Sequence, residues 1–454
     1  LTLNLGYVTS GLRLPQNDNN VRGIHSSAVN GDGRGPLAPL TLPNGQVVNR
    51  AWGFHRPGET FQRLTNQTIQ RFTSGATANY SPNSWLTSRA VVGLDLTGRT
   101  DQLLNRFEEG AFFSLDRQGI AAEARRTIAV YTIDANATAA FDLRDNITSK
   151  TTAGVNYNQN NFRGTNAQGD PLPPGAVTVT AGSNKQASET NNLVKTAGAF
   201  AQQTFGLSDR LFLTGAVRID RNSASGTLAK TIVYPKASVS YLISESGFFP
   251  TGSFLNSFRL RASYGHAGQQ PNGSQALESF FATAAAVGGT VQPAVAINNL
   301  GDPTLKPERS VEYEGGFDAN FLNSRLALEV TGFHKDTKDA LIFVPTPLSA
   351  GNPNGQFRNL GKVRNTGIEY ILNAQVLNGK SLGWDLTLSG SFLKNRLLDL
   401  GGQPPINANG VDQQHRENYP LGGYWGRPYT YDDANGDGII AASEITAGDS
   451  LEYI

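Results

Sequence analysis

The feature that most constrains this chain is a hydrophobic repeat of two residues, which recurs in segments of about ten residues. In residues 85–97, for example, Val92 and Leu94 fall on one face of an extended strand, and Arg89 and Asp95 fall on the other. About ten residues are enough for a tilted strand to cross a bilayer. The repeat therefore predicts strands with one side suited to lipid and the other suited to water.

The same pattern predicts about thirteen strands along the 454 residues. We expect them at 1–8, 67–80, 85–97, 127–142, 147–159, 190–205, 210–220, 232–243, 257–266, 309–321, 325–336, 365–375 and 383–394.

The connections between these strands alternate between short and long. Short turns read SPNS, LRDN, GLSD, LNS and NGKSL, with one longer example at 245–256. The other connections are long and rich in Gly, Asn and Pro, at 9–66, 98–126, 160–189, 267–308, 337–364 and from 395 onward, with a shorter one at 221–231. Tight turns at one rim and long extracellular loops at the other are typical of a transmembrane antiparallel β-barrel. Soluble propellers and sandwiches also alternate, but their strands are shorter, about 5–6 residues.

Composition excludes other classes of protein. Gly accounts for 50 residues, and hydrophobic residues make up only 38%, which is typical of a chain rich in turns. The 38 basic and 37 acidic residues are spread along the whole length, so we expect no nucleic-acid partner. The chain contains no cysteine, so disulfides and thiolate zinc sites are excluded. No apolar run approaches the roughly 18 residues of a spanning helix, and membrane residence would depend on strands.

Several segments resemble the TonB-dependent receptor family, in places its SusC-like branch. They include DRLFLTGAVRIDRNSA (209–224), YPKASVSYLISES followed by NSFRLRASYGHAGQQP, and NLGDPTLKPERSVEYEGGFDANF. The last is similar to the Asn-Pro-x-Leu-Lys-Pro-Glu loop of the family, with Gly301-Asp302 where the family has Asn. NLGKVRNTGIEY and FLKNRLLDL are similar to the strands that follow, and YPLGGYWG with DANGDGII looks SusC-like. These motifs cover most of residues 200–445 and occur in the order of the family.

The resemblance implies a plugged barrel of about 22 strands, of which residues 1–454 would form about 13–14. We expect the plug, the TonB-contacting segment and the closing strands to lie outside this chain. The resemblance also implies the outer membrane of a Gram-negative bacterium, contact with its lipid, energy from a TonB complex, and a possible SusD-like surface lipoprotein as partner. The expected function is active uptake of a bulky solute such as an oligosaccharide, a peptide or a siderophore, without enzymatic chemistry.

Two other functions stay open at this point. A passive porin or a surface adhesin could use the same barrel, and a soluble β-rich ligand-binding domain could carry similar strands. A plug and a TonB-contacting segment upstream would distinguish an energised transporter from a porin or an adhesin. Retention in the membrane fraction would distinguish both from a soluble domain.

Residues 433–444 match the spacing of a calcium-binding loop, within a predicted extracellular loop. Asp433, Asn435, Asp437 and Glu444 stand at positions 1, 3, 5 and 12 of that loop, and Ile439 would offer its carbonyl oxygen at position 7. Glycines and a proline nearby argue against flanking helices, so this would be a calcium loop on a β protein. A solvated turn without metal is the alternative.

Aromatic residues in the long loops are further candidates for ligand contact, because an aromatic ring stacks well on a sugar. Packing of the loop against its neighbours is the more common use of such residues. The candidates are Trp52, Phe54, Phe112, Phe113, Phe280 and Phe281.

Overall fold

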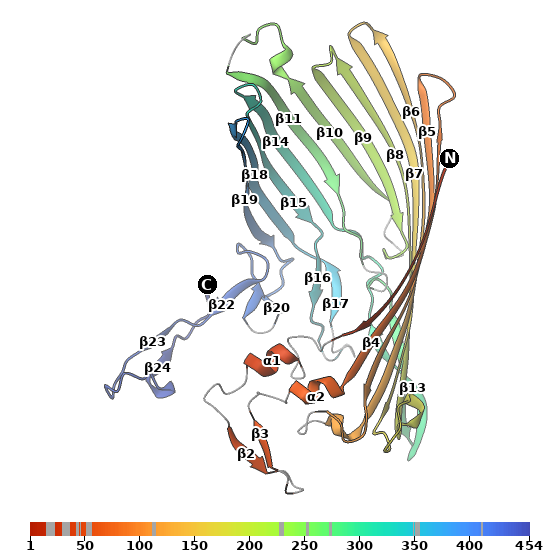
Figure 1. The fold of residues 1–454 in the computed structure, drawn as a ribbon, viewed down its shortest axis with the longest axis vertical. Helices are drawn as coiled ribbons and strands as arrows, with labels where there is room; N and C mark the ends of the chain where they lie inside the picture. The colour runs from red at the N-terminus through yellow and green to blue at the C-terminus, as the bar shows by residue number, and fades with distance from the viewer. Residues whose placement is uncertain are drawn as a thin grey trace. The chain divides into compact units, whose positions relative to one another are not determined.

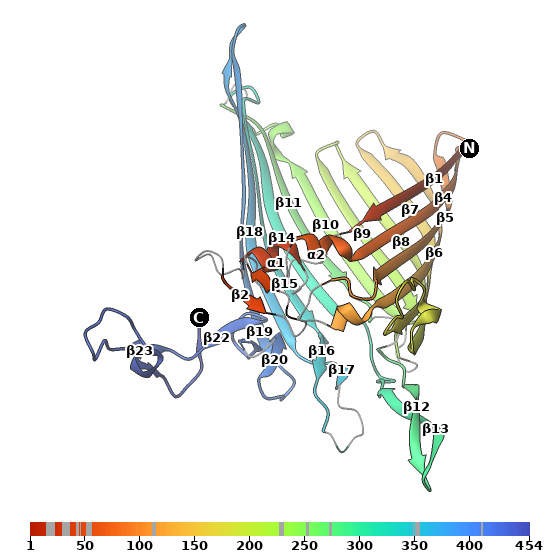
Figure 2. The same cartoon turned by 60° about the horizontal axis from the view of Figure 1, so that its bottom comes forward.

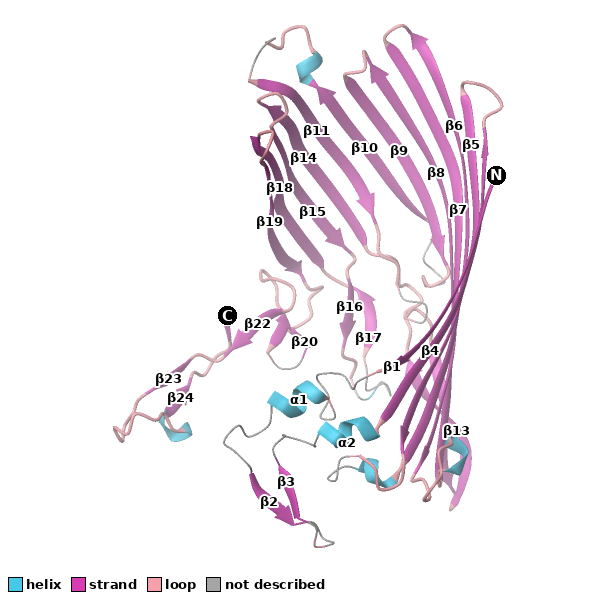
Figure 3. Cartoon of the chain, in the orientation of Figure 1, coloured by secondary structure: helices cyan, strands magenta, loops and turns pink. Residues whose placement is uncertain are grey.

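The computed structural model describes residues 1–14, 23–29, 37–41, 45, 47–50, 57–110, 115–226, 231–250, 254–271, 275–347, 349, 355–409 and 412–454. Figure 1 shows the chain from the N-terminus in red to the C-terminus in blue, and Figure 3 shows that strands dominate it. Among the described residues, no helix is long and apolar enough to cross a membrane.

Thirteen antiparallel strands form the principal sheet, in the hydrogen-bonded order β1-β4-β5-β6-β7-β8-β9-β10-β11-β14-β15-β18-β19. Each neighbour is the next long strand along the chain, which is the meander expected of an up-and-down barrel. The bounds are β1 Thr2–Arg13, β4 Leu64–Tyr80, β5 Leu86–Asn105, β6 Ile120–Arg144, β7 Ile147–Asp170, β8 Asn184–Leu207, β9 Leu211–Asn222, β10 Ile232–Leu242, β11 Leu255–Ala267, β14 Arg309–Phe321, β15 Leu326–Lys338, β18 Lys362–Asn378 and β19 Gly383–Asp399.

Each of the thirteen predicted strands corresponds to one of these strands, so the number and order of strands are confirmed. The predicted ends are wrong in one respect, because the strands next to the early long loops run much further than the apolar repeat. β6 begins at Ile120 where 127 was predicted, and β7 ends at Asp170 where 159 was predicted. The backbone ladder continues here through polar residues, since hydrogen bonds between strands do not require apolar side chains.

By its internal contacts the chain divides into two units, which we describe separately. Unit 1 comprises residues 1–79, 89–135 and 156–195, and unit 2 comprises residues 80–88, 136–155 and 196–454.

In unit 2 the strand register places residues of like character side by side on each face. Leu260 lies opposite Phe317, Phe317 opposite Val330, and Val330 opposite Tyr370. Exposed large apolar side chains are frequent on this side, among them Phe392, which is 71% exposed. We call this side the outer face of unit 2, because exposed apolar side chains in such a band suit the lipid of a membrane.

The opposite, inner face of unit 2 is polar, and several of its charges are paired. Arg261 on β11 forms an ion pair with Asp318 on β14 at 2.8 Å, and Lys335 on β15 lies 3.8 Å from Glu312 on β14. Ser263 donates a hydrogen bond to Glu314 across the same strands. A polar inner face is what lines the interior of a large barrel.

Unit 1 shows the same division between two faces. Val92 and Leu96 on β5 and Tyr131 on β6 are exposed on its outer face, at 54%, 41% and 44%. On the other side of β5, Asp95 forms an ion pair with Arg71 of β4. The lipid side and the water side predicted for residues 85–97 are therefore the two faces observed here.

Small elements occupy the long connections. The helices are α1 Ile24–Val29 and α2 Pro57–Gln62, and the short strands are β2 Leu37–Thr41, β3 Val47–Arg50, β12 Ser279–Val287, β13 Thr290–Asn299, β16 Leu341–Val344, β17 Gln356–Asn359, β20 Ile406–Asn409, β21 Gln413–His415, β22 Gly423–Gly426, β23 Tyr429–Tyr431, β24 Ile445–Ala447 and β25 Glu452–Tyr453. β12 and β13 form a hairpin that projects beyond the ends of β11 and β14 (Figure 2).

The apolar core of the described chain lies where the loops cover the sheet of unit 2. Leu397 on β19 and Leu400 after it are 0% and 1% exposed, and they pack with Ile342 and Val344 of β16 and with Val363 of β18. This cluster fixes the β16–β17 hairpin against the ends of β18 and β19.

Candidate functional site

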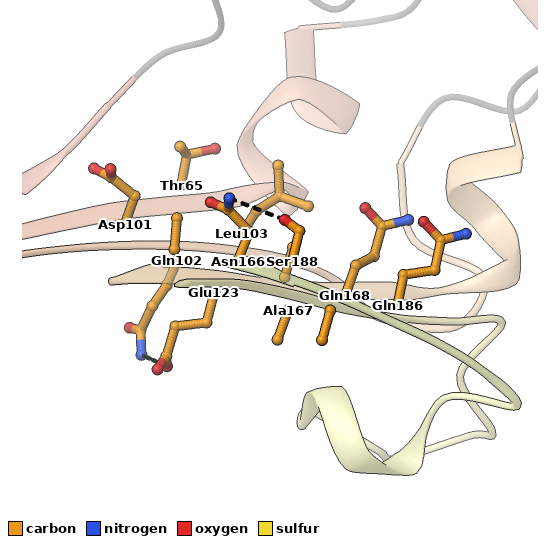
Figure 4. Close-up of a pocket in the computed structure, with 13 residues that line it drawn as sticks. Thr65, Asp101, Gln102, Leu103, Glu123, Asn166, Ala167, Gln168, Gln186 and Ser188 are labelled. Atoms are coloured by element: carbon orange, nitrogen blue, oxygen red, sulfur yellow. Dashed lines mark hydrogen bonds between the residues drawn. The ribbon is translucent and has the colours of Figure 1, made fainter. Parts of the chain in front are cut away.

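A pocket of about 490 Å³ lies on the extended ends of β5 to β8 in unit 1 (Figure 4). Each of these strands contributes three consecutive residues, 101–103, 122–124, 166–168 and 186–188, and Thr65 of β4 completes the lining. In a strand, the first and third residues of such a triplet point to one face and the middle residue points to the other. Asp101 and Leu103 share the side of Asp95, so the pocket opens on the inner face.

Alanine methyl groups give this pocket its depth. Ala122 and Ala124 on β6 point to the inner face, between the larger side chains of β5 and those of β7 and β8. Figure 4 shows Asp101, Asn166, Gln186 and Ser188 on one side of the sheet, and Gln102 and Glu123 on the other. Gln102 donates a hydrogen bond of 3.0 Å to Glu123 there, so it is held away from the pocket.

Asp101 organises the β5 wall of the pocket. Its carboxylate accepts hydrogen bonds from Gln67 of β4 at 2.8 Å, from Arg99 at 2.9 Å and from Arg126 of β6 at 2.7 Å. The two guanidinium groups would repel one another without the carboxylate between them. The three strands are therefore tied together at this level by charge-assisted hydrogen bonds, which are stronger than neutral ones.

Neutral polar side chains form the opposite wall. Asn166 of β7 donates a 3.3 Å hydrogen bond to the hydroxyl of Ser188 on β8, and Gln168 donates one of 2.6 Å to Asp170. Gln186 also points into the pocket (Figure 4). A carboxamide offers both donors and an acceptor, so this wall suits an uncharged ligand in which donors and acceptors alternate.

Of the loop aromatics predicted as ligand contacts, two belong to the described residues. Trp52, Phe54, Phe112 and Phe113 fall outside the described residues. Phe280 and Phe281 lie in the β12–β13 hairpin, where they are 56% and 49% exposed, and they do not line the pocket. Their contact with a ligand stays a prediction.

The proposed calcium loop is carried by a two-stranded hairpin, since β23 precedes it and pairs with β24 after it. Gly436 and Gly438 donate their N–H groups to the two carboxylate oxygens of Asp433, each at 2.9 Å. Ile439 donates its N–H to Asp437 at 2.7 Å.

Two further contacts close the calcium loop. The amide of Asn435 donates to Asp437 at 3.1 Å, and Ala441 donates its N–H to Glu444 at 2.9 Å. Oxygen donors of this kind suit Ca²⁺. No group of three or more His, Cys, Asp or Glu side chains that could hold a metal is found within the described parts of the chain. Calcium binding therefore stays a prediction.

Sequence reasoning missed the pocket residues because it assigned 98–126 and 160–189 to loops. Asp101, Asn166 and Ser188 lie in polar stretches in which the hydrophobic repeat has ended. The residual signal is a run of alternating small and polar residues, such as Ala122, Glu123 and Ala124, which continues the strand alternation without apolar side chains.

Comparison with known proteins shows which family and which relatives this chain is similar to. The family model described as the TonB-dependent receptor-like β-barrel matches residues 8–448. A TonB-dependent receptor of Formosa agariphila is 30% identical over 207 residues, which are 45% of this chain and 21% of that protein. The TonB-dependent receptor SusC of Bacteroides thetaiotaomicron is 26% identical over 222 residues, which are 45% of this chain and 21% of SusC.

Solved structures share the fold. The RagAB peptide transporter superposes with a TM-score of 0.79 at 16% identity, over 92% of this chain and 47% of that chain. The ferric-catecholate import receptor Fiu of E. coli superposes with a TM-score of 0.51 at 14% identity, over 89% of this chain and 56% of that chain. This chain thus spans about half the length of these structures and less than a quarter of the curated relatives.

The predicted fold class, an antiparallel transmembrane barrel of which this chain forms part, is confirmed by thirteen meandering strands, a polar inner face and these matches. The same matches confirm the predicted localisation to the outer membrane of Gram-negative bacteria. They also confirm the predicted resemblance to the SusC-like branch. The chain belongs to the TonB-dependent receptor-like β-barrel family.

Proposed function

We propose that the parent protein takes up a bulky solute across the outer membrane, with energy from a TonB complex. The observation that carries this proposal is the sheet of thirteen meandering strands with a polar inner face, in a chain that the family model matches over 8–448. A barrel of about 22 strands encloses a lumen wide enough to need a plug. Displacing a plug requires work, and the outer membrane has no ATP of its own to supply it.

The strands in this proposal supply a path and contacts, and no bond-making chemistry. The relatives named above are receptors and transporters. The inner pocket of unit 1 offers carboxamides, a hydroxyl and a carboxylate whose charge is already compensated by Arg99 and Arg126. Of an oligosaccharide, a peptide and a siderophore, this lining favours the first two, because hydroxyl groups and peptide units present alternating neutral donors and acceptors.

Uptake by intact cells tests the transport itself. Cells with the full-length gene should accumulate labelled oligosaccharides or peptides, and deletion of either the gene or tonB should abolish accumulation. Accumulation that persists without TonB would instead establish a passive porin. Membrane residence with no accumulation of any of the three solutes would favour an adhesin.

A pair of variants tests the pocket. Gln168→Ala combined with Gln186→Ala removes two inner carboxamides, and we expect about tenfold weaker uptake at low solute concentration, since two lost hydrogen bonds are worth about 1.4 kcal/mol or more. Gln102→Ala is the matched control, because this carboxamide lies on the same strand ends but points to the other face. Equal uptake by both variants would exclude the pocket from the solute path.

A surface lipoprotein of the SusD-like kind is the partner that we propose for the long-loop end. The similarity to SusC and to the RagAB peptide transporter supports it. Purification of the tagged full-length protein from outer membranes should retain a surface lipoprotein. A protein that purifies alone and still imports its solute would overturn this partnership.

We also propose that residues 433–444 bind Ca²⁺ through Asp433, Asn435, Asp437, Glu444 and the carbonyl of Ile439. The hydrogen bonds from Gly436 and Gly438 already hold Asp433 inside the loop, which supports this assignment. Calorimetric titration of the full-length protein with Ca²⁺ should show one site that Asp437→Ala abolishes. Asp449→Ala, an exposed carboxylate outside the loop, is the control. Titration without heat above background would leave a solvated turn.

A further inference from the structure

The outer face of unit 2 changes character within a few residues at the end that carries the long loops. Ala262, Gly315, Gly332, Ile368 and Phe392 lie side by side on β11, β14, β15, β18 and β19. One step outward, two residues further along each strand, the positions are held by Tyr264, Tyr313, His334, Thr366 and Lys394. The rings of Tyr264 and Tyr313 are in contact, with their centroids 5.1 Å apart. Tyrosines at such a boundary mark the level where lipid tails give way to head groups.

The next two rows are charged. Asp336, Arg364 and Arg396 are neighbours in the first, and Arg309, Lys338 and Lys362 are neighbours in the second. Cations therefore stand directly opposite one another at Arg309 and Lys338, at Lys338 and Lys362, and at Arg364 and Arg396. Like charges at opposed positions destabilise a sheet.

Few carboxylates compensate this surface. Asp336 accepts Arg364 at 2.7 Å and Lys362 at 3.2 Å. Asp339 accepts Lys306 at 3.0 Å and Arg309 at 3.1 Å.

Asp399 lies opposite Lys362, but its carboxylate accepts the N–H of Gly401. Seven Lys and Arg residues lie in these rows or next to them, and we call them the basic surface. They are Lys306, Arg309, Lys338, Lys362, Arg364, Lys394 and Arg396. Among the described residues, Asp336, Asp339 and Asp399 contact or face these cations, and the carboxylates of Glu308 and Glu417 accept backbone N–H groups from Leu341 and Leu400 nearby.

A cavity of about 810 Å³ opens within the basic surface. Val233, Pro235 and Val311, which occupy outer-face positions, line it beside Lys306, Arg309 and Lys338. Val233 is 50% exposed. The cavity therefore combines an apolar floor of Val233, Pro235 and Val311 with a rim of Lys306, Arg309 and Lys338, in which Asp339 also takes part.

The loop that carries Lys306 is held in place by Asn359 of β17. The side chain of Asn359 accepts the N–H of Lys306 at 2.8 Å and donates to the carbonyls of Lys306 at 2.7 Å and Asp339 at 2.9 Å. Leu305 beside it is fully buried. The rim of the cavity is thus fixed before any ligand arrives.

We propose that the basic surface binds the phosphorylated head group of a lipid in the outer leaflet. The phosphate would lie among Arg309, Lys338 and the neighbouring cations, where its charge relieves their mutual repulsion. The part of the lipid next to the phosphate would lie over Val233 and Val311, and the acyl chains would continue past the tyrosine row onto the apolar rows. A free phosphate would contact the cations but not the apolar residues. The apolar floor therefore favours a lipid over a free phosphate. The proposal rests on the orientation of the family, with long loops outside, and not on uptake.

Native mass spectrometry of the full-length protein in neutral detergent tests the proposal. With added phosphatidate the wild type should carry bound lipid, and with phosphatidylcholine it should carry much less. Lys338→Gln combined with Arg396→Gln should weaken phosphatidate binding by about tenfold or more, at about 1 kcal/mol for each cation. Both residues are exposed, and in the parts of the chain that the structure describes neither is seen in an ion pair with a carboxylate, so the variant should fold.

Lys236→Gln combined with Lys380→Gln is the matched control, because Lys236 points to the inner face and Lys380 lies in a short turn. Equal phosphatidate binding by both double variants would overturn the proposal. Full competition by inorganic phosphate would also overturn it, since the apolar floor would then contribute nothing. Loss of binding in Lys338→Gln alone, with an unchanged circular dichroism spectrum, would support it independently. Uptake assays report separately on transport.

Discussion

The inner pocket of unit 1 and the basic surface of unit 2 hold their charges in opposite ways. In the pocket, Arg99 and Arg126 share the carboxylate of Asp101, which lies within 2.8 Å of both. On the basic surface, Lys338 and Arg396 stand opposite other cations with no carboxylate partner observed among the described residues. In the first arrangement two cations share one carboxylate, so each is paired, whereas in the second Lys338 and Arg396 have no such partner and their charge suits an anion. Both occur at strand ends, so the pairing of each cation, and not position, separates the two kinds of site.

The largest expected effect concerns how the basic surface is held. Asn359→Ala removes three hydrogen bonds to Lys306 and Asp339, and we expect a local loss of about 3 kcal/mol. Hydrogen exchange of residues 302–309 should rise accordingly, and phosphatidate binding should fall although no charge is lost. Asn378→Ala, at the exposed end of β18, should change neither. If Asn359→Ala bound phosphatidate as well as the wild type, charge alone would be sufficient for lipid binding and a fixed rim would not be needed.

Next in size is removal of the shared carboxylate. Asp101→Ala leaves Arg99 and Arg126 adjacent without an anion, so the free energy of unfolding should fall by about 2 kcal/mol. Urea unfolding in detergent measures it. Added salt should restore part of the loss by screening the two guanidinium groups. If stability did not change, the pocket would owe its shape to the strands rather than to Asp101.

A smaller effect of opposite sign is expected on the basic surface. In neutral detergent, Lys338→Gln with Arg396→Gln should raise the free energy of unfolding by about 0.5 kcal/mol, because it relieves like-charge repulsion across the strands. The same urea experiment, run beside Asp101→Ala, compares the two regions directly. A loss of stability in the double variant would mean that these cations are already compensated.

The smallest expected effect is a pH dependence in the loop after β19, outside both regions. Burial lowers the pKa of His415 below its ordinary value of about 6.5, and its Nδ1 accepts the N–H of Gly422 at 3.1 Å. The unfolded chain therefore binds the proton more readily, so stability is complete above about pH 6.5 and declines as the pH falls through the folded pKa. Hydrogen exchange of Gly422 should rise over this range, and His415→Gln should abolish the dependence.

The hydrophobic repeat predicted the thirteen strands and their faces, because alternation of lipid and water sides is enforced at every position inside a bilayer. It failed on the extended ends of β5 to β8, where polar residues such as Asp101 and Gln102 occupy both faces and the apolar repeat has ended. The pocket lies on those extensions, so Asp101 and Asn166 were assigned to loops. Whether Phe280 and Phe281 contact a ligand stays a prediction, because it depends on loop packing that residue spacing does not encode.

The sequence by itself determined the strand order, the two faces and the family, since these follow from local alternation and from motifs read in order. Only the tertiary structure decided which side chains become neighbours. The register between β14, β15 and β18 sets Arg309 beside Lys338 and Lys338 beside Lys362, residues that are 24 or more positions apart along the chain. Hydrogen bonds between strands fix that register, and a shift of one residue would send each of these side chains to the other face.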